Sequence, residues 1–247
     1  MRLTVLGGCG AWPEAGQACS GYLIEHDGFR LVVDLGYATV PRLLASVGAG
    51  DVDAVYISHG HPDHCADLNP LLRARALAGR PPAPLPVYAP AGALDAVLAL
   101  DRPETLAGSY DVRTVGAGET VQIGPFAAEA RLLPHWLPNL GLRLTAAGLT
   151  VAYTGDTGPS DEVVKLARDA DLLIAEATYL DPVPSDARPY LSSAQVAGRQ
   201  AAAAGAGRVL LTHLWPGTDD AAALAASAAA YPGELGVATA GLVLDLG

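Results

Sequence analysis

The stretch HGHPDH at residues 59–64 places three of the chain's six histidines and an aspartate within six positions. Along an extended segment, residues two apart point the same way, so His59 and His61 can bind one ion together. The proline that follows turns the chain, and Asp63 and His64 can then reach a second ion. Imidazoles with a carboxylate favour zinc or iron. The alternative is a solvated histidine-rich loop, but four such residues at a strand end favour a metal site.

Two ions need more ligands than one loop supplies, and three further residues qualify. His135 and His213 each follow an apolar strand segment, and Asp156 ends another in AYTGDTG. The glycines around Asp156 let the backbone approach an ion closely, and its two oxygens can bridge two ions. The candidate ligands are therefore His59, His61 and His135 for one ion and Asp63, His64 and His213 for the other, with Asp156 between them.

The elements that must position these residues follow from apolar alternation, helical spacing and turn signals. Strands are expected at 2–7, 21–26, 29–36, 54–59, 87–90, 171–179, 208–215 and 241–247, with strand pairs at 120–135 and 141–158. Helices are expected at 40–48, 66–79, 92–100, 160–170, 192–207 and 219–230. Turns at Asp27-Gly28 and Ala147-Gly148 would close two hairpins. This alternation predicts an α/β fold.

Two local matches indicate an internal duplication. The hairpin at 22–36 has a counterpart at 142–158, and VYISH at 55–59 has one in VLLTH at 209–213. Chance is an alternative, since any two hairpins share apolar alternation. Two matches in the same order nevertheless favour two β-rich halves, each ending in polar residues at the strand ends where sites gather.

Composition limits the class of protein. A chain of 247 residues can bury a core as a single domain spanning 1–247. No apolar run is long enough to span a bilayer, and the start of the chain lacks the pattern of a signal peptide. The three cysteines show no CxxC spacing, so free thiols are expected. The expected location is the cytoplasm, without a membrane partner.

The charge excludes one group of substrates. The net charge is −11 and Lys165 is the only lysine. A nucleic-acid-binding protein normally carries a basic stripe that neutralises phosphates, and none is visible. Nucleic acid is therefore an unfavourable partner, and a small-molecule substrate is expected.

The motifs together resemble those of the metallo-β-lactamase-fold hydrolases: HGHPDH at 59–64, His135, Asp156 in TGDTG and His213 in LLTHLW, in the family's order. The resemblance implies a four-layer αββα sandwich built from two similar halves. It also implies a dinuclear site, normally zinc with manganese or iron as alternatives, whose bridging hydroxide is the nucleophile. Two cations about 3.5–4 Å apart lower the pKa of a shared water, so hydroxide forms at neutral pH.

Within the family, the sequence is nearest to the ribonuclease Z-like and phosphodiesterase branch. AEATY at 175–179 resembles that branch's HEAT segment, with Glu176 kept and Ala175 in place of histidine. Tyr190 stands where a second histidine linked to proton transfer is expected, and it could donate a proton or only pack at a helix start. The long tRNA-binding arm is missing. With Asp63, Glu176 and Tyr190 are the candidate catalytic residues.

These observations predict a dinuclear zinc hydrolase acting on a small molecule, most plausibly on a phosphodiester. A lactonase or carboxylic-ester hydrolase of the same fold is the alternative, because such lactonases share all seven ligands and often use a nearby tyrosine. A non-catalytic metal-binding scaffold or sensor is the alternative from another class, although such members usually lose ligands that this chain keeps. A homodimer is possible, since dimers are common in the family.

Overall fold

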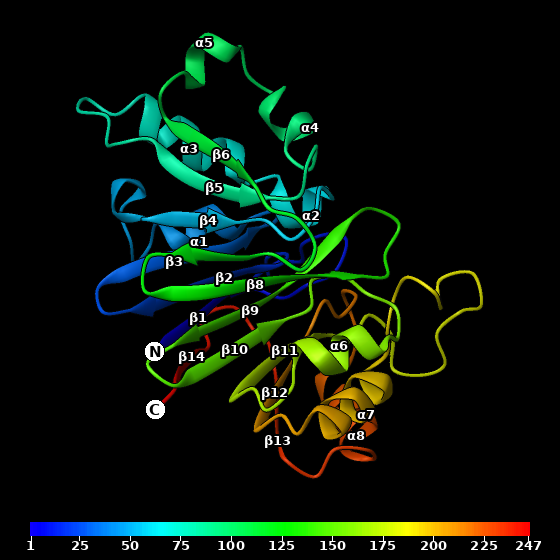
Figure 1. The fold of residues 1–247 in the computed structure, drawn as a ribbon. Coiled ribbons are helices and arrows are strands. Elements are labelled where there is room, and N and C mark those ends of the chain that lie inside the picture. Colours follow the sequence, from blue (N-terminus) through cyan, green and yellow to red (C-terminus); the bar gives the residue numbers. More distant parts are fainter.

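The computed structural model describes residues 1–247 and contains two seven-stranded mixed sheets that face each other (Figure 1). The first sheet has, in spatial order, β14 (Val243–Asp245), β1 (Arg2–Gly7), β2 (Gly21–His26), β3 (Phe29–Leu35), β4 (Ala54–Tyr56), β5 (Leu85–Ala89) and β6 (Tyr110–Thr114). The second has β13 (Glu234–Val237), β12 (Arg208–Thr212), β11 (Leu172–Glu176), β10 (Leu149–Tyr153), β9 (Asn139–Ala146), β8 (Phe126–Leu133) and β7 (Thr120–Ile123).

Helices cover the outer face of each sheet, which gives the four-layer αββα arrangement (Figure 1). The first sheet is covered by α1 (Thr39–Leu43), α2 (Pro62–Cys65), α3 (Leu68–Ala76), α4 (Asp95–Leu98) and α5 (Pro103–Leu106), with the short 3-10 helix η1 (Ala49–Asp51). The second is covered by α6 (Asp161–Leu166), α7 (Ala194–Ala204) and α8 (Asp220–Ala228). The sandwich predicted from the sequence is therefore confirmed.

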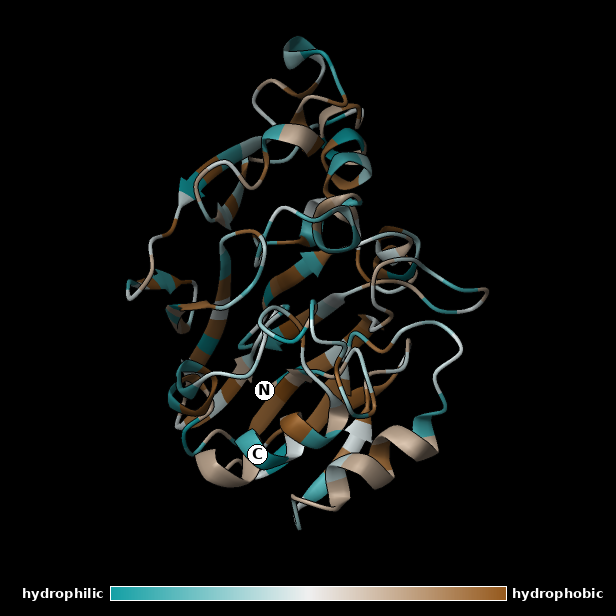
Figure 2. Cartoon of the chain, turned by 90° about the vertical axis from the view of Figure 1, so that its right-hand side faces the viewer, coloured by the Kyte–Doolittle hydropathy of each residue, from teal (hydrophilic) through white to brown (hydrophobic).

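Alternation along the strands builds three apolar layers. In β3, Leu31 and Val33 point into the core between the two sheets, whereas Val32 and Leu35 pack with the helices of the first sheet. In β10, Ala152 packs on the other side, with the helices of the second sheet. A strand that is covered on both faces must be apolar at successive positions, and Figure 2 shows hydrophobic strands inside a more polar shell. The two central sheets are thereby rigid supports for the loops at their ends.

The two halves repeat one another in strand direction. From β14 to β6 in the first sheet, three antiparallel strand pairings are followed by three parallel ones. The same order holds from β7 to β13 in the second sheet. Leu31–Val33 of β3 pair in parallel with Ala54–Tyr56 of β4, and Val151–Tyr153 of β10 pair in the same way with Leu172–Ile174 of β11. The match between the hairpins of the two halves is therefore confirmed.

The prediction that VYISH and VLLTH are equivalent strands of the two halves is wrong. VYISH begins in β4, whose topological equivalent is β11, whereas VLLTH forms β12, whose equivalent is β5. The sequence likeness arose because both strands are central, apolar and followed by a histidine. Central parallel strands share that composition whatever their place in the sheet.

Most other predicted elements are present, with shorter helices than expected. Both hairpin turns form, at Asp27-Gly28 and Ala147-Gly148. The strands β6 and β13 were not predicted, because both are edge strands with little buried alternation. None of the helices is long and apolar enough to cross a membrane. The three cysteines are free and buried, as predicted.

Candidate metal centre

The candidate ligands come together at one edge of the sandwich, where strands from both sheets end. His59 and His61 lie in the loop after β4, and Asp63 and His64 lie in α2, which begins at the proline between them. His135, Asp156 and His213 follow β8, β10 and β12 of the second sheet. Grouping at the carboxyl ends of strands is the usual place for a site in an α/β fold. All seven residues predicted from the sequence meet here.

The first cluster contains His59, His61, His135 and Asp156. The Nδ1 atom of His61 lies 3.1 Å from Nε2 of His59 and 3.1 Å from Nε2 of His135. Both Nε2 atoms lie 3.8 Å from Oδ2 of Asp156. His59 and Asp156 are buried, whereas His61 and His135 are half-buried. Three nitrogens and one oxygen thus converge on a single point that is open on one side.

The second cluster contains Asp63, His64, His213 and again Asp156, all buried. Nε2 of His213 lies 3.1 Å from Oδ2 of Asp63 and 3.1 Å from Oδ2 of Asp156. Nε2 of His64 lies 3.5 Å from Oδ2 of Asp63 and 3.1 Å from Oδ1 of Asp156. Asp156 therefore contributes to both clusters, as a bridging carboxylate would.

On the side of the first sheet, a hydrogen-bonded chain sets the orientation of two imidazoles. The Oδ2 atom of Asp34 accepts from Nδ1 of His64 at 2.7 Å and from Oγ of Ser58 at 2.8 Å. Because Ser58 donates its proton to Asp34, its oxygen accepts from Nδ1 of His59 at 3.0 Å. Each imidazole thus carries a proton on Nδ1 and directs Nε2 into the clusters, where its lone pair is free to bind a cation that takes the place of a second proton.

The second sheet holds the other two imidazoles in the same state. Nδ1 of His135 donates to the main-chain carbonyl of Tyr190 at 2.9 Å. The hydroxyl of Thr178 donates to Glu176 and accepts from Nδ1 of His213 at 2.8 Å. With His61, five imidazoles and two carboxylates therefore face one another at the centre, and such an arrangement needs cations between them.

The pKa shifts of the clustered side chains also indicate that the centre attracts positive charge. Burial lowers the pKa of His59 well below its usual value, and the neighbouring His64 lowers it further. Burial also acts to lower the pKa of His64, but Asp156 and Asp63 outweigh it and raise this pKa well above its usual value. Burial acts to raise the pKa of Asp156, but His213 and His64 outweigh it, so its pKa lies well below the ordinary range. The buried carboxylates are ionised and attract a cation.

The donor set fits zinc. Zinc takes nitrogen and oxygen ligands at about 2.0–2.2 Å, so tetrahedral neighbours lie about 3.3–3.6 Å apart, close to the separations in both clusters. Two buried atoms, Nε2 of His64 and Oδ1 of Asp156, have no hydrogen-bond partner. Buried polar atoms without partners are rare, and both of these point into the second cluster. A divalent ion there would satisfy them.

Local backbone strain accompanies the site. Asp34 and His213 adopt left-handed conformations, with φ of 55° and 59°. Gly155, which precedes Asp156, also has a positive φ of 59°, and a Cβ atom there would lie 2.2 Å from Oδ1 of Asn139. The amide of Asn139 donates to the main-chain oxygens of Thr154 and Asp156. Such strain persists only where the surroundings fix it, and it holds Asp156 at the centre.

Glu176 lies behind the centre and does not face it. Its buried carboxylate accepts from the backbone N–H groups of Thr157 and Ser192 and from the hydroxyl of Thr178. Burial, and then Asp156, raise the pKa of Glu176 to about 7. These contacts fix the loop after Asp156 and the position of Thr178. They give Glu176 a positioning role, and its part in catalysis stays a prediction.

Tyr190 contacts the site through its main chain. Its carbonyl orients His135, while its half-buried ring packs on Trp136 with ring centroids 5.0 Å apart. The hydroxyl makes no hydrogen bond within the chain, so a role as proton donor also stays a prediction. Tyr190 lies four residues before the first residue of α7, and packing at the start of this helix stays a prediction.

The residues that hold the imidazoles were only partly predicted. By position alone, the sequence indicates Asp34, Asp67 and Thr212 as residues that could fix the tautomers. Asp34 does so, whereas Asp67 accepts from the N–H of Val40 in α1 and Thr212 contacts Tyr22, so these two expectations are wrong. Ser58 and Thr178 were missed; Ser58 directly precedes His59 in sequence, which is the one signal that could have indicated it.

Comparison with known proteins identifies the family. Residues 28–214 match the model of the β-lactamase superfamily domain. A probable metallo-hydrolase, YhfI of Bacillus subtilis, is 34% identical over 221 residues, with 87% of each chain covered. The chain belongs to the β-lactamase superfamily.

Solved structures and further relatives of this chain come from the metal-dependent branches of the superfamily. The crystal structure of YhfI, described as a metallo-β-lactamase fold protein, superposes with a TM-score of 0.91 at 30% identity, covering 98% of both chains. A ribonuclease Z of Kineococcus radiotolerans is 30% identical over 285 residues, covering 95% of this chain and 90% of its own. Human tRNase Z, short form, shares the fold with a TM-score of 0.81 at 24% identity over both full chains. These relatives support a metal-dependent hydrolase of the ribonuclease Z and phosphodiesterase branch.

Proposed function

We propose that this superfamily member is a dinuclear zinc-dependent hydrolase that cleaves a phosphodiester bond in a small molecule. The observation that carries the proposal is the place of Asp156, whose Oδ1 lies 3.1 Å from His64 and whose Oδ2 lies 3.1 Å from His213 and 3.8 Å from both His59 and His135. One carboxylate shared by two complete donor sets is the arrangement that two adjacent ions need.

The chain's own residues would divide the work as follows. Bound as a pair, the two ions would lower the pKa of a shared water and polarise the phosphoryl oxygen. Asp63 and Asp156 would offset part of their charge, and the imidazoles would fix their positions. Asp34, Ser58 and Thr178 would keep each imidazole in the tautomer that binds metal. Manganese or iron would satisfy the same donors.

Family likeness supports a phosphodiester in preference to a lactone or carboxylic ester. Several relatives near 30% identity are named ribonuclease Z. A diphosphatase of the PhnP family, at 18% identity and a TM-score of 0.78, supports the fold alone. Phosphoryl transfer also suits the centre physically, because two ions can hold the attacking and leaving oxygens in line.

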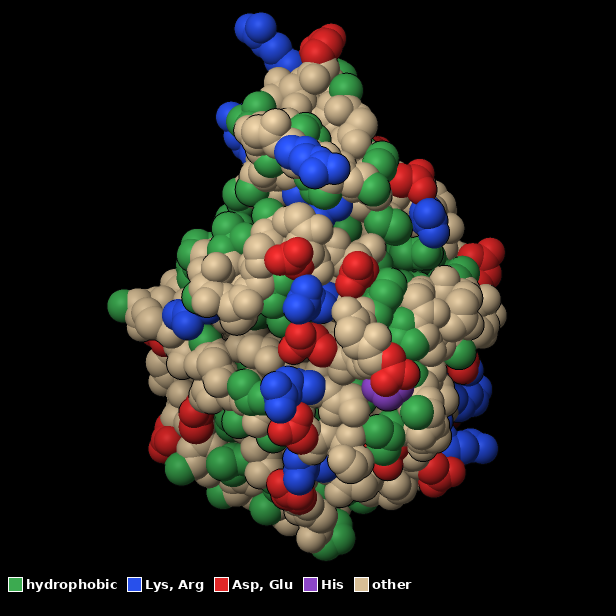
Figure 3. Space-filling model, turned by 90° about the vertical axis from the view of Figure 1, so that its left-hand side faces the viewer, with side chains coloured by type: hydrophobic (Ala, Val, Ile, Leu, Met, Phe, Trp, Pro, Cys, Tyr) green, Lys and Arg blue, Asp and Glu red, His purple; other side chains and the backbone are tan.

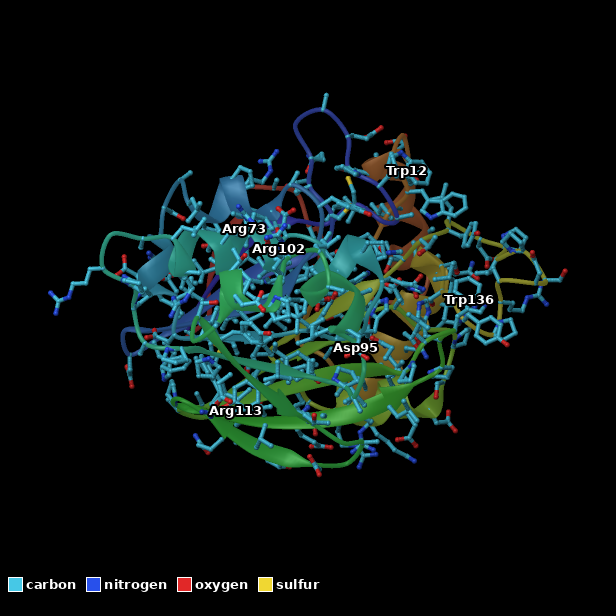
Figure 4. All side chains as sticks on the ribbon, turned by 90° about the horizontal axis from the view of Figure 1, so that it is seen from above. Trp12, Arg73, Asp95, Arg102, Arg113 and Trp136 are labelled. Atoms are coloured by element: carbon cyan, nitrogen blue, oxygen red, sulfur yellow. The ribbon has the colours of Figure 1, made fainter.

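Charge supports a small substrate with a single negative charge. Three cavities, of about 440, 350 and 510 Å³, lie beside the centre, and none is lined by lysine or arginine. Each contains a carboxylate in its lining, for example Asp95 or Glu162. In Figure 4, the labelled Arg73, Arg102 and Arg113 lie away from the end that carries Trp136. Figure 3 shows basic side chains interspersed with acidic ones on another face. A polyanion would be repelled, whereas two bound ions can attract a monoanion.

The experiment is turnover by the zinc-loaded full-length chain. Bis-4-nitrophenyl phosphate is compared with 4-nitrophenyl phosphate, which carries a second charge, and with a panel of lactones and aryl esters. We expect the diester to be the best substrate. His61→Ala should abolish its turnover, whereas His26→Ala, at the histidine that ends β2 outside both clusters, should not. If lactones are turned over in preference, the proposed substrate is a lactone and not a phosphodiester. If none of the compounds is turned over, the proposed hydrolase activity is contradicted.

A further inference from the structure

The three tryptophans of the chain are exposed and surround the candidate metal centre. Trp12, Trp136 and Trp215 expose 48%, 52% and 38% of their surface. Tryptophan is usually well buried, so three exposed copies at one site indicate a function. Figure 4 shows Trp12 and Trp136 at the same end of the molecule. Two tyrosines join them, so that aromatic rings stand on both sides of the centre.

The first aromatic wall consists of Trp136 and Tyr190, and it stands beside the first cluster. Trp136 directly follows His135, and their ring centroids are 5.2 Å apart. Tyr190 packs on Trp136 at 5.0 Å with an interplanar angle of 33°, and its carbonyl accepts from His135. Both rings are therefore tied to a candidate metal ligand through direct contacts.

The second aromatic wall consists of Trp12, Trp215 and Tyr179, and it stands beside the second cluster. Trp215 lies two residues after His213, with its ring 5.9 Å from that of Trp12 and 5.1 Å from that of Tyr179. Tyr179 follows Thr178, the residue that orients His213. Trp12 follows Ala11, whose N–H donates to Asp63 at 2.9 Å. This wall too is tied to candidate ligands.

The five side chains of the two walls are uncharged, and the charges in the adjacent cavities are carboxylates. None of the five side chains makes a hydrogen bond within the chain, and no basic residue lines the adjacent cavities. Indole and phenol faces attract another flat ring through offset or edge contacts. The metal ions would hold the phosphate, and the walls would hold what the phosphate carries.

We propose that the walls bind a planar aromatic ring carried by the substrate, so that the preferred phosphodiester bears such a ring; this rests on the proposed phosphodiesterase function for the anchoring group. A saturated ring of the same size is equally apolar but cannot stack. Preference for a planar ring therefore separates stacking on the walls from general hydrophobic attraction. Nucleobases and simple aryl groups share this chemistry, and substrates carrying each distinguish the two sources.

The test uses phosphinates, which carry the single charge of a phosphodiester but have no bond that the enzyme could hydrolyse. Binding of methyl(benzyl)phosphinate and methyl(cyclohexylmethyl)phosphinate to the zinc-loaded chain is measured by calorimetry. We expect the benzyl compound to bind about 5- to 50-fold more tightly. Its binding should also change the tryptophan emission, because no tryptophan lies outside the walls. A phosphinate that carries a methyl-linked nucleobase in place of the benzyl group tests whether the walls prefer a nucleobase to a simple aryl ring.

Variants separate the walls from other apolar surface. Trp136→Leu and Trp215→Leu keep apolar bulk and remove the large ring, so we expect the preference for benzyl to fall toward unity in at least one of them. Leu77→Ala, at an exposed leucine beyond the end of α3, should leave the preference unchanged. Equal affinities in the unmodified chain, no binding of either phosphinate, or an unchanged preference in both tryptophan variants would overturn the proposal.

The outcome is distinguishable from a failure of the proposed function. If benzyl phosphinate binds preferentially but no phosphodiester is cleaved, the aromatic walls are supported and the phosphodiesterase reaction is contradicted. If diesters are cleaved at equal efficiency with phenyl and cyclohexyl groups beside the same leaving group, the reaction is supported and the ring preference is contradicted.

Discussion

The two donor clusters share Asp156 but differ in burial and in the groups that hold their imidazoles. All members of the second cluster are buried, whereas the first contains the half-buried His61; the side chain of His135, also in the first cluster, is only 1% exposed. Burial excludes water and strengthens the interaction of an ion with its ligands. We therefore expect the second cluster to bind an ion more tightly and a substrate to approach the first from the side of His61.

The supports of the clusters differ in the same direction. In the second cluster, His64 is held by the carboxylate of Asp34, and His213 is held by Thr178. In the first, His59 is held by Ser58, which itself donates to Asp34, and His135 is held by a main-chain carbonyl. His61 has no partner outside its own cluster. A charged acceptor raises the basicity of an imidazole more than a neutral one. The two clusters at one edge of the fold thus differ in burial and in their supports, and we expect two bound ions to differ in affinity.

The largest effect is expected from Asp156→Asn, because this residue serves both clusters. An amide removes the negative charge that both ions need and leaves the five imidazoles of the two clusters without it. Metal content should fall from about two ions per chain to below one, and turnover should fall to background. Elemental analysis of the dialysed protein gives the metal content, and thermal unfolding checks the fold. A variant that keeps two ions would contradict the sharing of Asp156.

A smaller effect, stronger in the second cluster than in the first, is expected from Asp34→Asn. The amide would place a donor opposite Nδ1 of His64, which favours the wrong tautomer, whereas it reaches His59 of the first cluster only through Ser58. Zinc affinity of the second cluster should fall about 10- to 100-fold, and that of the first cluster should fall less. Visible spectra of the cobalt-substituted protein follow the two sites separately. Equal weakening of both sites would break the distinction drawn between them.

Thr178→Val should act on the same cluster more weakly. Valine keeps the shape of threonine but removes the oxygen that accepts from His213, and it leaves one acceptor of Glu176 without its donor. Loss of this neutral partner should lower the metal affinity of the second cluster by about tenfold. Competition with a chelator of known affinity measures the change. Thr145→Val, at a hydroxyl between β9 and β10, is the matched control.

The smallest effect is expected from Tyr190→Phe. Because Tyr190 holds His135 through its main chain and its hydroxyl has no partner, the variant should keep turnover within about threefold of the parent. The pH dependence of kcat should also be unchanged. A loss of about 100-fold or more with a changed pH profile would instead make the hydroxyl a proton donor to the leaving group.

The sequence predicted the seven candidate ligands because histidines and aspartates at strand ends are conspicuous in an apolar chain. It also predicted the sandwich and the hairpins of both halves. The pairing of VYISH with VLLTH failed, because composition does not record where a strand lies within its sheet. Edge strands such as β6 were missed because they are short and mostly exposed, so they lack the apolar run of a buried strand.

The supports of the imidazoles show where sequence reasoning stops. Asp34 and His64 are thirty residues apart, and Thr178 and His213 are thirty-five apart. Only the packed sheets bring these partners within hydrogen-bond distance. Serine and threonine are common everywhere, so only its place directly before His59 could have indicated Ser58, and nothing in the sequence distinguishes Thr178. The aromatic walls likewise join residues from four separate loops.

Stepwise zinc titration of the metal-free chain by calorimetry tests the two-ion centre most directly. We predict two binding events of unequal affinity, together about two ions per chain. His61→Ala should remove the weaker event and keep the tighter one, whereas His64→Ala should weaken the tighter one, and His26→Ala should change neither. A single event with one ion per chain, or loss of the tighter event in His61→Ala, would contradict the account.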